Sequence, residues 1–308
     1  MTLQQLEYIV AVNKYRHFVT AAESCGVTQS TLSSMIHKLE EELDVTIFDR
    51  SAHPIRPTNT GEEILRQAQV VLFHAKQLKE TSSCERKRLS GDLSIGITPT
   101  ISPYIVPKLF RYFTKHYPDI TLHPTEMHRE GTLSRLRKAE IDVAILSVPD
   151  STPDLLEIPL YKERFAAYVS TEDPLYAEEE LCFKDLPMDR LWSLKNQICF
   201  QSQICSTGEN LCDSISSFES GSLVTLFMLV EENGGFTFLP EMHIAQLSKN
   251  RRQHVRPLVN PVPMRQVSMF VRHDYVRESL LNALATAIKS IIPKEMLDER
   301  LLKFPIRL

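Results

Sequence analysis

The 308-residue chain is 43% hydrophobic and 24% charged, the composition of an ordinary folded protein, and it is too long for one small core. Its formal net charge is −4, which excludes a nucleic-acid binder that works through overall positive charge. No stretch approaches the roughly 18 consecutive apolar residues that cross a membrane, and the N-terminus MTLQQLEY has no signal-peptide pattern. We therefore expect a cytoplasmic protein with no membrane partner.

The first predicted element is a helix at residues 2–13. Its inner face is expected to carry Leu3, Leu6, Ile9 and Val10. This helix would support the next segment from behind.

Residues 18–43 predict a helix-turn-helix. Ala21 and Ala22 begin a short helix, and Gly26 supplies the turn because glycine adopts left-handed conformations at little cost. Thr28 or Ser30 then caps a second helix. The apolar face of that helix consists of Leu32, Met35, Ile36, Leu39 and Leu43.

The exposed start of the second helix carries short hydroxyl and amide side chains, which can contact base edges or phosphates in a major groove. The residues expected to contact DNA there are Thr28, Gln29, Ser30, Thr31, Ser33, Ser34 and Lys38. A plain helical hairpin with a polar surface remains the alternative from the pattern alone.

Residues 45–63 alternate apolar and polar residues around two prolines, which predicts a β-hairpin wing. Arg50 at its base and Arg56 at its tip are expected to face DNA phosphates, although a surface arginine is as often simply solvated. Acidic residues outnumber basic ones in residues 1–58. DNA affinity would therefore depend on local placement of the basic groups and on two copies of the domain.

Residues 61–83 predict a long helix with one continuous apolar stripe. The stripe consists of Ile64, Leu65, Ala68, Val71, Leu72, Ala75 and Leu78. A helix that connects two domains has no core of its own, so we expect the stripe to pair with a second subunit. The alternative is that it packs on its own C-terminal domain. The charged run at residues 84–91 is interpreted as a hinge.

From residue 92 onward, strands alternate with helices, which predicts a parallel sheet with helices on both faces. Helices are expected at residues 103–115, 131–139 and 275–292. The length suits two lobes joined by crossing strands near residues 165–170 and 266–272.

Three hydroxyl side chains lie where the first strand of this region ends and a helix begins. They are Thr98, Thr100 and Ser102. In open α/β sheets ligands bind beyond the strand ends, next to helix N-termini. We therefore predict an effector pocket at these residues; simple capping of the helix is the alternative.

Residues 2–75 resemble the N-terminal domain of the LysR-type transcriptional regulators. The matching residues are Leu3, Leu6, Ala11, Phe18, Ala21, Ala22, Val27, Thr28, Gln29, Ser30, Leu32, Ser33, Ile36, Leu39, Glu40, Leu43, Ile47, Phe48, Arg50, Thr58, Thr60 and Gly61. The family often has basic residues on the outer face of the second helix, whereas Ser34, His37 and Lys38 supply one fixed charge here.

The resemblance implies a winged helix-turn-helix at residues 1–60 and a linker helix and hinge at 61–90. It also implies an α/β effector domain at 91–308, with two lobes like those of periplasmic binding proteins. Lobe I would comprise about residues 91–163 and 268–308, and lobe II about 164–267. The implied partners are double-stranded operator DNA, further copies of the chain in a homodimer or homotetramer, and RNA polymerase.

The second lobe is similar to the peroxide-sensing branch of this family. The similar segments are residues 219–242, residues 255–271 and the C-terminal run LLNALATAIKSIIPKEML. Cys199 falls where that branch carries its reactive cysteine, and Gln203 and Thr100 match positions of its pocket.

The flanking residues differ from that branch, which has Gly-His before the cysteine and Arg-Asp after it. Gln197, Ile198, Gln201 and Ser202 stand there in this chain, so the groups that would activate a thiolate are missing. Gly208 stands where the resolving cysteine is expected, with Cys205 and Cys212 on either side. A disulfide from Cys199 to one of these two is therefore one interpretation, and a buried structural cysteine is the other.

The sequence thus predicts a transcriptional regulator, an activator that responds to hydrogen peroxide. The alternative is a regulator of the same type switched by a small organic effector between the lobes. A thiol peroxidase is disfavoured because nothing in the sequence activates Cys199. We expect no cofactor, and no metal because the cysteine spacings CX5C and CX6C do not suit zinc.

Overall fold

The computed structural model describes residues 1–52, 54–83, 89–147, 152–194, 216–218, 222–303 and 305–306. The chain forms two compact units, one comprising Met1–Arg88 and Arg137–Glu140 and the other comprising Leu89–Leu136 and Ile141–Leu308. Four residues of the predicted redox site or pocket lie outside the described residues: Cys199, Gln203, Cys205 and Cys212. Within the described part, no helix is long and apolar enough to cross a membrane.

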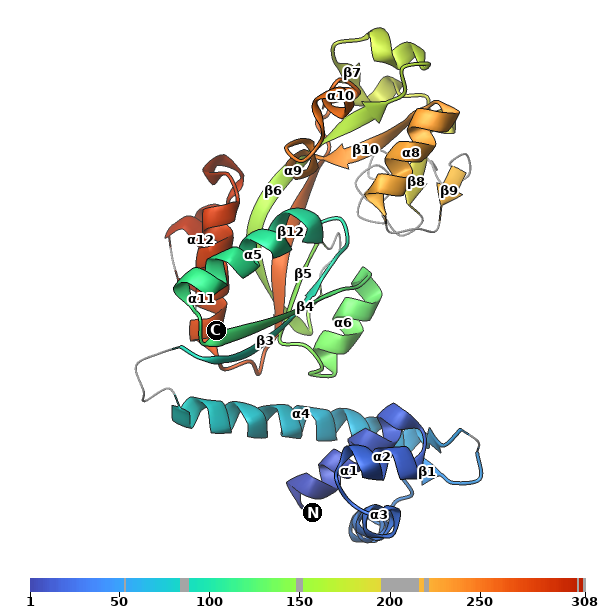
Figure 1. Cartoon of the computed structure of the whole chain (residues 1–308), viewed down its shortest axis with the longest axis vertical. Helices are drawn as coiled ribbons and strands as arrows, with labels where there is room; N and C mark the ends of the chain where they lie inside the picture. The colour runs from blue at the N-terminus through green and yellow to red at the C-terminus, as the bar shows by residue number, and fades with distance from the viewer. Residues whose placement is uncertain are drawn as a thin grey trace. The chain divides into compact units, whose positions relative to one another are not determined.

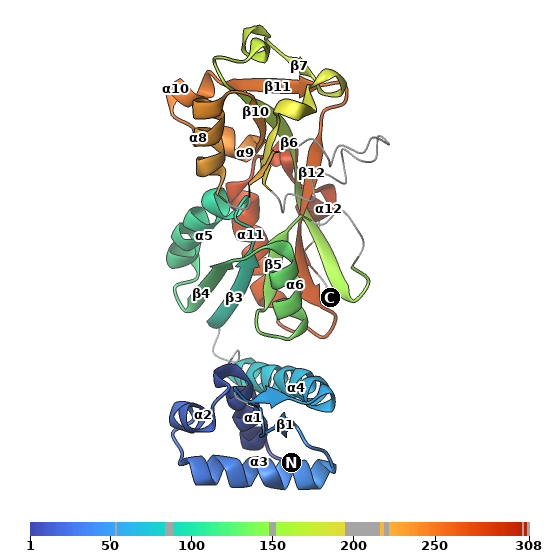
Figure 2. The same cartoon turned by 90° about the vertical axis from the view of Figure 1, so that its right-hand side faces the viewer.

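The first unit is a helical domain with a small hairpin (Figures 1 and 2). Its elements are α1 (Leu3–Tyr15), α2 (Phe18–Ser24), α3 (Gln29–Leu43), β1 (Phe48–Asp49), β2 (Arg56–Pro57) and α4 (Asn59–Ser83). Strands β1 and β2 pair antiparallel, which confirms the predicted hairpin.

Local sequence explains where the helices of this unit begin. Thr2 caps α1 in a capping box with Gln5, and Thr28 caps α3 by accepting from the Thr31 amide. Gly26 has φ +69° in the turn between α2 and α3. The helix-turn-helix is confirmed, and Thr28 rather than Ser30 is the cap.

The core of the unit differs from the predicted inner face of α1. Leu3 is 44% exposed, whereas Gln5 and Tyr8 are buried beside Leu6 and Ile9. Gln5 can be buried because its side-chain amide donates to the Met35 carbonyl at 3.2 Å. The prediction for Leu3 was therefore wrong by a rotation about the helix axis.

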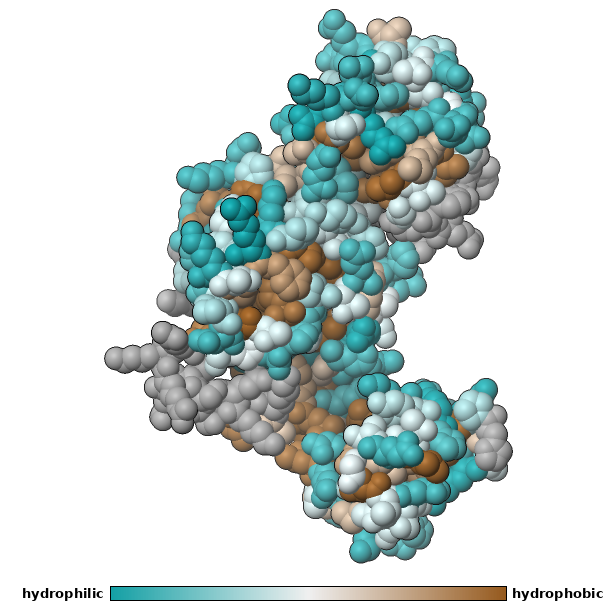
Figure 3. All heavy atoms as spheres, viewed as in Figure 1, coloured by the Kyte–Doolittle hydropathy of each residue, from teal (hydrophilic) through white to brown (hydrophobic). Residues whose placement is uncertain are grey.

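The apolar stripe on α4 has a buried part and an exposed part. Leu65 and Ala68 are buried in the core of the first unit, and Ile64 and Leu72 pack against that core. The expectation that the stripe has no core of its own is wrong for this half, because α4 packs on α1. Val71 and Leu78 remain 41% and 74% exposed. Hydrophobic residues gather along the visible part of α4 in Figure 3.

The second unit begins with a parallel β-layer, as predicted. Strands β4 (Ile120–Glu126), β3 (Gly91–Ile97) and β5 (Val143–Leu146) are adjacent and parallel. Helices α5 (Ser102–His116) and α11 (Glu278–Ile291) pack on each other. Helix α6 (Arg129–Arg137) packs its leucines on Ala144 and Leu146 of β5. Figures 1 and 2 show α5 and α11 on one face of this layer and α6 on the other.

Two long antiparallel strands join the lobes of the second unit. Strand β6 (Leu155–Val169) pairs with β12 (Met264–Arg272) up to Arg164, and its last residues pair with β10 (Phe236–Pro240) and β11 (Val255–Val259). The crossings therefore lie near residues 164 and 264, next to the predicted segments 165–170 and 266–272. Strand β12 runs antiparallel to β5, so the full sheet is mixed.

The second lobe is completed by short elements around β6. They are β7 (Leu181–Cys182), β8 (Trp192–Leu194), β9 (Ser216–Phe218), α8 (Leu223–Asn233), α9 (Glu241–Ile244) and α10 (Lys249–Arg252), with α12 (Glu299–Lys303) near the C-terminus. One-turn 3-10 helices occur at Pro174–Ala177, Phe183–Asp185, Met188–Arg190 and Lys294–Met296.

Candidate DNA-binding surface and lobe junction

The start of α3 presents the predicted polar side chains to solvent. Thr28, Gln29, Ser30, Thr31, Ser34 and Lys38 are exposed, and Ser33 is half-buried. The Thr28 hydroxyl lies 3.0 Å from that of Ser30 and 2.9 Å from that of Thr31. These three hydroxyls hydrogen-bond to one another, which leaves them fewer bonds to offer DNA. The Gln29 side chain is longer and makes no hydrogen bond among the described residues, so it is the best placed to reach a base.

The two wing arginines have different surroundings. Arg56 is exposed in β2 opposite Asp49, so it does not lie at the tip of the hairpin. Arg50 follows β1 and donates from Nη2 to Oε2 of Glu40 at 2.8 Å. Its guanidinium also lies over the ring of Phe18.

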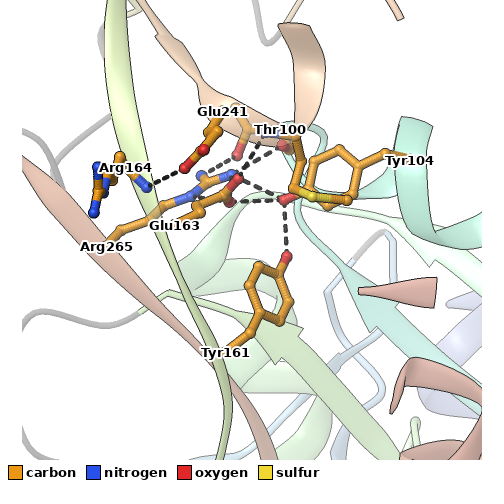
Figure 4. A network of polar contacts seen from close by, with 8 residues as sticks. Thr100, Tyr104, Tyr161, Glu163, Arg164, Glu241 and Arg265 are labelled. Carbon is orange, nitrogen blue, oxygen red and sulfur yellow. Dashed lines mark hydrogen bonds and ion pairs between the residues drawn. The ribbon is translucent and has the colours of Figure 1, made fainter. Parts of the chain in front are cut away.

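A buried polar network occupies the junction of the two lobes in the second unit (Figure 4). Arg265 on β12 donates from Nε to Glu163 on β6 at 2.8 Å. It also donates to the Thr100 hydroxyl at 2.9 Å, to the Thr100 carbonyl at 3.1 Å and to the Tyr104 hydroxyl at 3.2 Å. The side chains of Arg265 and Glu163 are 6% and 0% exposed. Both charges are therefore removed from water and paired.

Two tyrosines complete this network. The Tyr104 hydroxyl donates to Glu163 at 2.8 Å and lies 2.8 Å from the Tyr161 hydroxyl. Burial and the charge of Glu163 raise the pKa of Tyr104, and burial likewise raises the pKa of Tyr161. Burial alone would lower the pKa of Arg265, but the charge of Glu163 holds it above its ordinary value. Arg265 is thus a permanent cation and both tyrosines stay protonated.

Helix α9 connects the second lobe to this network. The Met242 amide donates to Glu163 at 3.4 Å, and the carboxylate of Glu241 accepts from the Arg164 amide at 3.4 Å (Figure 4). The ring of His243 packs edge-on against Tyr104 with 5.2 Å between centroids. Burial and the nearby Arg265 charge lower the pKa of His243 to about 4, so this imidazole is neutral at pH 7.

A cleft of about 730 Å³ lies beside α9. Its described lining includes Pro99 and Pro103 from one lobe, and Phe227, His243 and Leu247 from the other. The side chain of Gln246 bridges the lobes by donating to the Pro103 carbonyl at 3.2 Å. The rest of the described lining adds ionisable side chains, namely Glu126, His128 and Arg251, so the cleft presents polar groups beside an apolar wall.

The three hydroxyl residues predicted to form an effector pocket do not line this cleft. Thr98, Thr100 and Ser102 are absent from the described lining of the cleft. Thr100 contacts Arg265, and Ser102 is buried at the first residue of α5. The capping alternative is not supported either, since no side chain caps α5.

The junction residues Arg265, Glu163, Tyr104, Tyr161 and His243 were not predicted from the sequence. Glu163 and Arg265 are 102 residues apart, and each stands in a strand where either face is possible. The sequence offered little signal, because Glu163 stands between Lys162 and Arg164 and such a charged run indicates an exposed strand segment as readily as a buried ion pair.

Comparison with known proteins identifies both parts of the chain. Residues 3–62 match the family model of the bacterial regulatory helix-turn-helix protein, lysR family. Residues 86–291 match the LysR substrate binding domain.

The relatives extend over nearly the whole chain. The hydrogen peroxide-inducible genes activator of Haemophilus influenzae is 32% identical over 306 residues, covering 95% of this chain and 99% of that protein. The HTH-type transcriptional regulator EstR of Acinetobacter baylyi is 32% identical over 295 residues, which cover 94% of this chain and 97% of that protein. Full-length OxyR from Pseudomonas aeruginosa has a similar structure, with a TM-score of 0.80, 31% identity and coverage of 97% and 98%. The chain therefore belongs to the LysR family of DNA-binding transcriptional regulators, which are not enzymes, and it closely resembles OxyR.

Proposed function

We propose that this regulator activates transcription in response to hydrogen peroxide, with Cys199 as the reactive thiol. The observation that carries the proposal is the likeness to OxyR and to a hydrogen peroxide-inducible genes activator over both units of the chain. The resemblance implies that Cys199 stands at the position of the reactive cysteine in the second lobe. Operator DNA, a dimer or tetramer built through α4, RNA polymerase and a cytoplasmic location are part of the same proposal. The proposal also includes the division of the chain into a DNA-binding domain at residues 1–60, a linker helix and hinge at 61–90 and an effector domain at 91–308.

The proposed chemistry needs two thiols and one peroxide. The Cys199 thiolate attacks one peroxide oxygen, so that an S–O bond forms, the O–O bond breaks and hydroxide leaves. The thiol of Cys205 or Cys212 then attacks the sulfenic sulfur, which forms a disulfide and releases water. Two cysteines are oxidised and one peroxide is reduced to two waters. Because Gln197, Ile198, Gln201 and Ser202 supply no positive charge, we expect the first step to be slow.

The test combines peptide mass spectrometry with DNA footprinting before and after peroxide. Wild-type protein should form a disulfide between Cys199 and Cys205 or Cys212, and its footprint should change. Cys199→Ser should abolish both effects. Cys25→Ser is the matched control, since Cys25 is a free thiol in the DNA-binding unit, and it should respond as wild type does. A wild-type footprint that ignores peroxide would refute the proposal.

A second candidate function is a regulator switched by a small organic effector. The cleft of about 730 Å³ between the lobes favours it, because its volume suits a small molecule. Under this proposal peroxide leaves the footprint unchanged. Val224 lines the cleft and is 53% exposed, so Val224→Trp should occupy part of the cleft and alter regulation without oxidising any cysteine. Unchanged regulation by Val224→Trp would count against an effector in this cleft.

A further inference from the structure

A buried carboxylate connects the recognition helix to the wing in the first unit. Glu40 lies on α3, and its side chain is 9% exposed. Acidic side chains are seldom buried unless they are paired. Within a DNA-binding unit an acidic group also repels phosphates, so its presence at this position calls for a physical role.

Each oxygen of Glu40 holds a different part of the wing. Oε1 accepts from the Ile47 amide at 2.8 Å and from the Phe48 amide at 3.3 Å. Oε2 accepts from Nη2 of Arg50 at 2.8 Å. One carboxylate on α3 therefore fixes both the backbone that enters β1 and the arginine that follows β1.

The Arg50 guanidinium is held on a second side by an aromatic ring. Its carbon lies 5.6 Å from the ring centroid of Phe18, at the first residue of α2, and Phe18 packs edge-on against Phe48 at 6.4 Å. The arginine side chain is still 44% exposed. Glu40 engages one of its nitrogens, and the other N–H donors have no partner among the described residues. A guanidinium has five such donors in a rigid plane, so an outward edge is available for a phosphate.

We propose that Glu40 is a positioning residue for DNA recognition, which sets the outward edge of Arg50 at a constant distance from α3. Phosphate contacts determine the register of a protein on the duplex, and base contacts from the recognition helix then read the sequence. Glu40 links these two functions because it belongs to α3 and holds Arg50. The inference rests on the DNA-binding role of this unit and extends it to a residue that never touches DNA.

The test uses the full-length protein, its Glu40→Gln variant and two duplexes. One duplex is selected by the wild-type protein from a randomised library, and the other has the same length and composition in scrambled order. Glutamine retains an oxygen for the Ile47 and Phe48 amides but loses the charged bond to Arg50. The matched control is Glu41→Gln, which removes the same charge from an exposed neighbour.

The two variants should differ in specificity. Glu40→Gln should bind the selected duplex roughly 3- to 10-fold more weakly, the effect of one charge-assisted hydrogen bond, while binding the scrambled duplex at least as well as wild type. Glu41→Gln should change both affinities alike, since it removes a repelling charge and an exposed contact with His37 at 3.3 Å, neither of which involves the wing. Equal ratios of the two affinities in both variants would overturn the proposal. So would a parallel loss on both duplexes by Glu40→Gln.

A second substitution keeps the inference testable if Glu40→Gln unfolds the unit. Arg50→Lys retains the positive charge but loses the planar group that Glu40 and Phe18 hold. It should lower the ratio of selected to scrambled affinity without changing the salt dependence of binding. An unchanged ratio would overturn the proposal. If the wild-type protein selects no duplex, sequence-specific DNA binding fails, which is distinct from a failure of the role of Glu40.

Discussion

Replacing Glu163 by glutamine should strongly destabilise the second unit. Glu163 is fully buried and accepts from Arg265, from the Tyr104 hydroxyl and from the Met242 amide. Glutamine has one oxygen fewer to accept these bonds, and it leaves the buried Arg265 cation without a counter-charge. Removing one partner of a buried ion pair costs about 3–5 kcal/mol. For a unit of this size that cost lowers the melting temperature by roughly 6–20 °C.

The only tryptophan of the chain offers a selective assay. Trp192 lies in the second unit and donates to the Gly234 carbonyl at 2.9 Å, so its fluorescence reports unfolding of this unit. Glu157→Gln is the matched control, because Glu157 is on the same strand but exposed; it should cost less than about 1 kcal/mol. If the two variants melt within about 2 °C of each other, a scatter typical of surface changes, the charge of Glu163 does not stabilise the junction.

Three further predictions concern pH, the linker helix and DNA contact. Between pH 6.5 and 4 the unfolded chain holds a proton on His243 that the folded chain does not, because the folded pKa is lowered to about 4. Stability should therefore fall by about 3 kcal/mol as pH drops through this window, and melting curves of His243→Phe should lack this part of the pH dependence. Leu78→Asp, at a 74% exposed position, should dissociate the oligomer in sedimentation while both units stay folded. Leu65→Asp, at a 3% exposed position, should instead unfold the DNA-binding unit, as circular dichroism would show. Gln29→Ala should reduce discrimination at one base pair by roughly 1–3 kcal/mol, whereas Arg56→Ala should weaken binding to all duplexes and lower the salt slope by about one; competition titrations separate the two.

Much of the first unit could be predicted from the sequence because its signals are local. A cap such as Thr28 acts on an amide three residues away, and Leu32, Ile36 and Leu39 share one face through helical spacing alone. These short-range features determined the helix-turn-helix. The dense match to a known family then determined its role.

The contacts at the lobe junction and the burial of one part of α4 could not be predicted from the sequence, because they depend on tertiary structure. The sequence predicts an exposed hydroxyl for Thr100 at the end of a strand. In the structure Arg265, which is 165 residues away, donates a hydrogen bond to it. Ile64 and Leu78 lie two heptads apart and so have the same place in a helical repeat, but only Ile64 packs against the core of the first unit. Periodicity specifies which residues share a face, and only the packing of distant segments decides what that face contacts. The sequence by itself therefore determined the family and the order of the elements, whereas the ionised pair at the junction and the anchor of Arg50 on Glu40 became visible only in the folded chain.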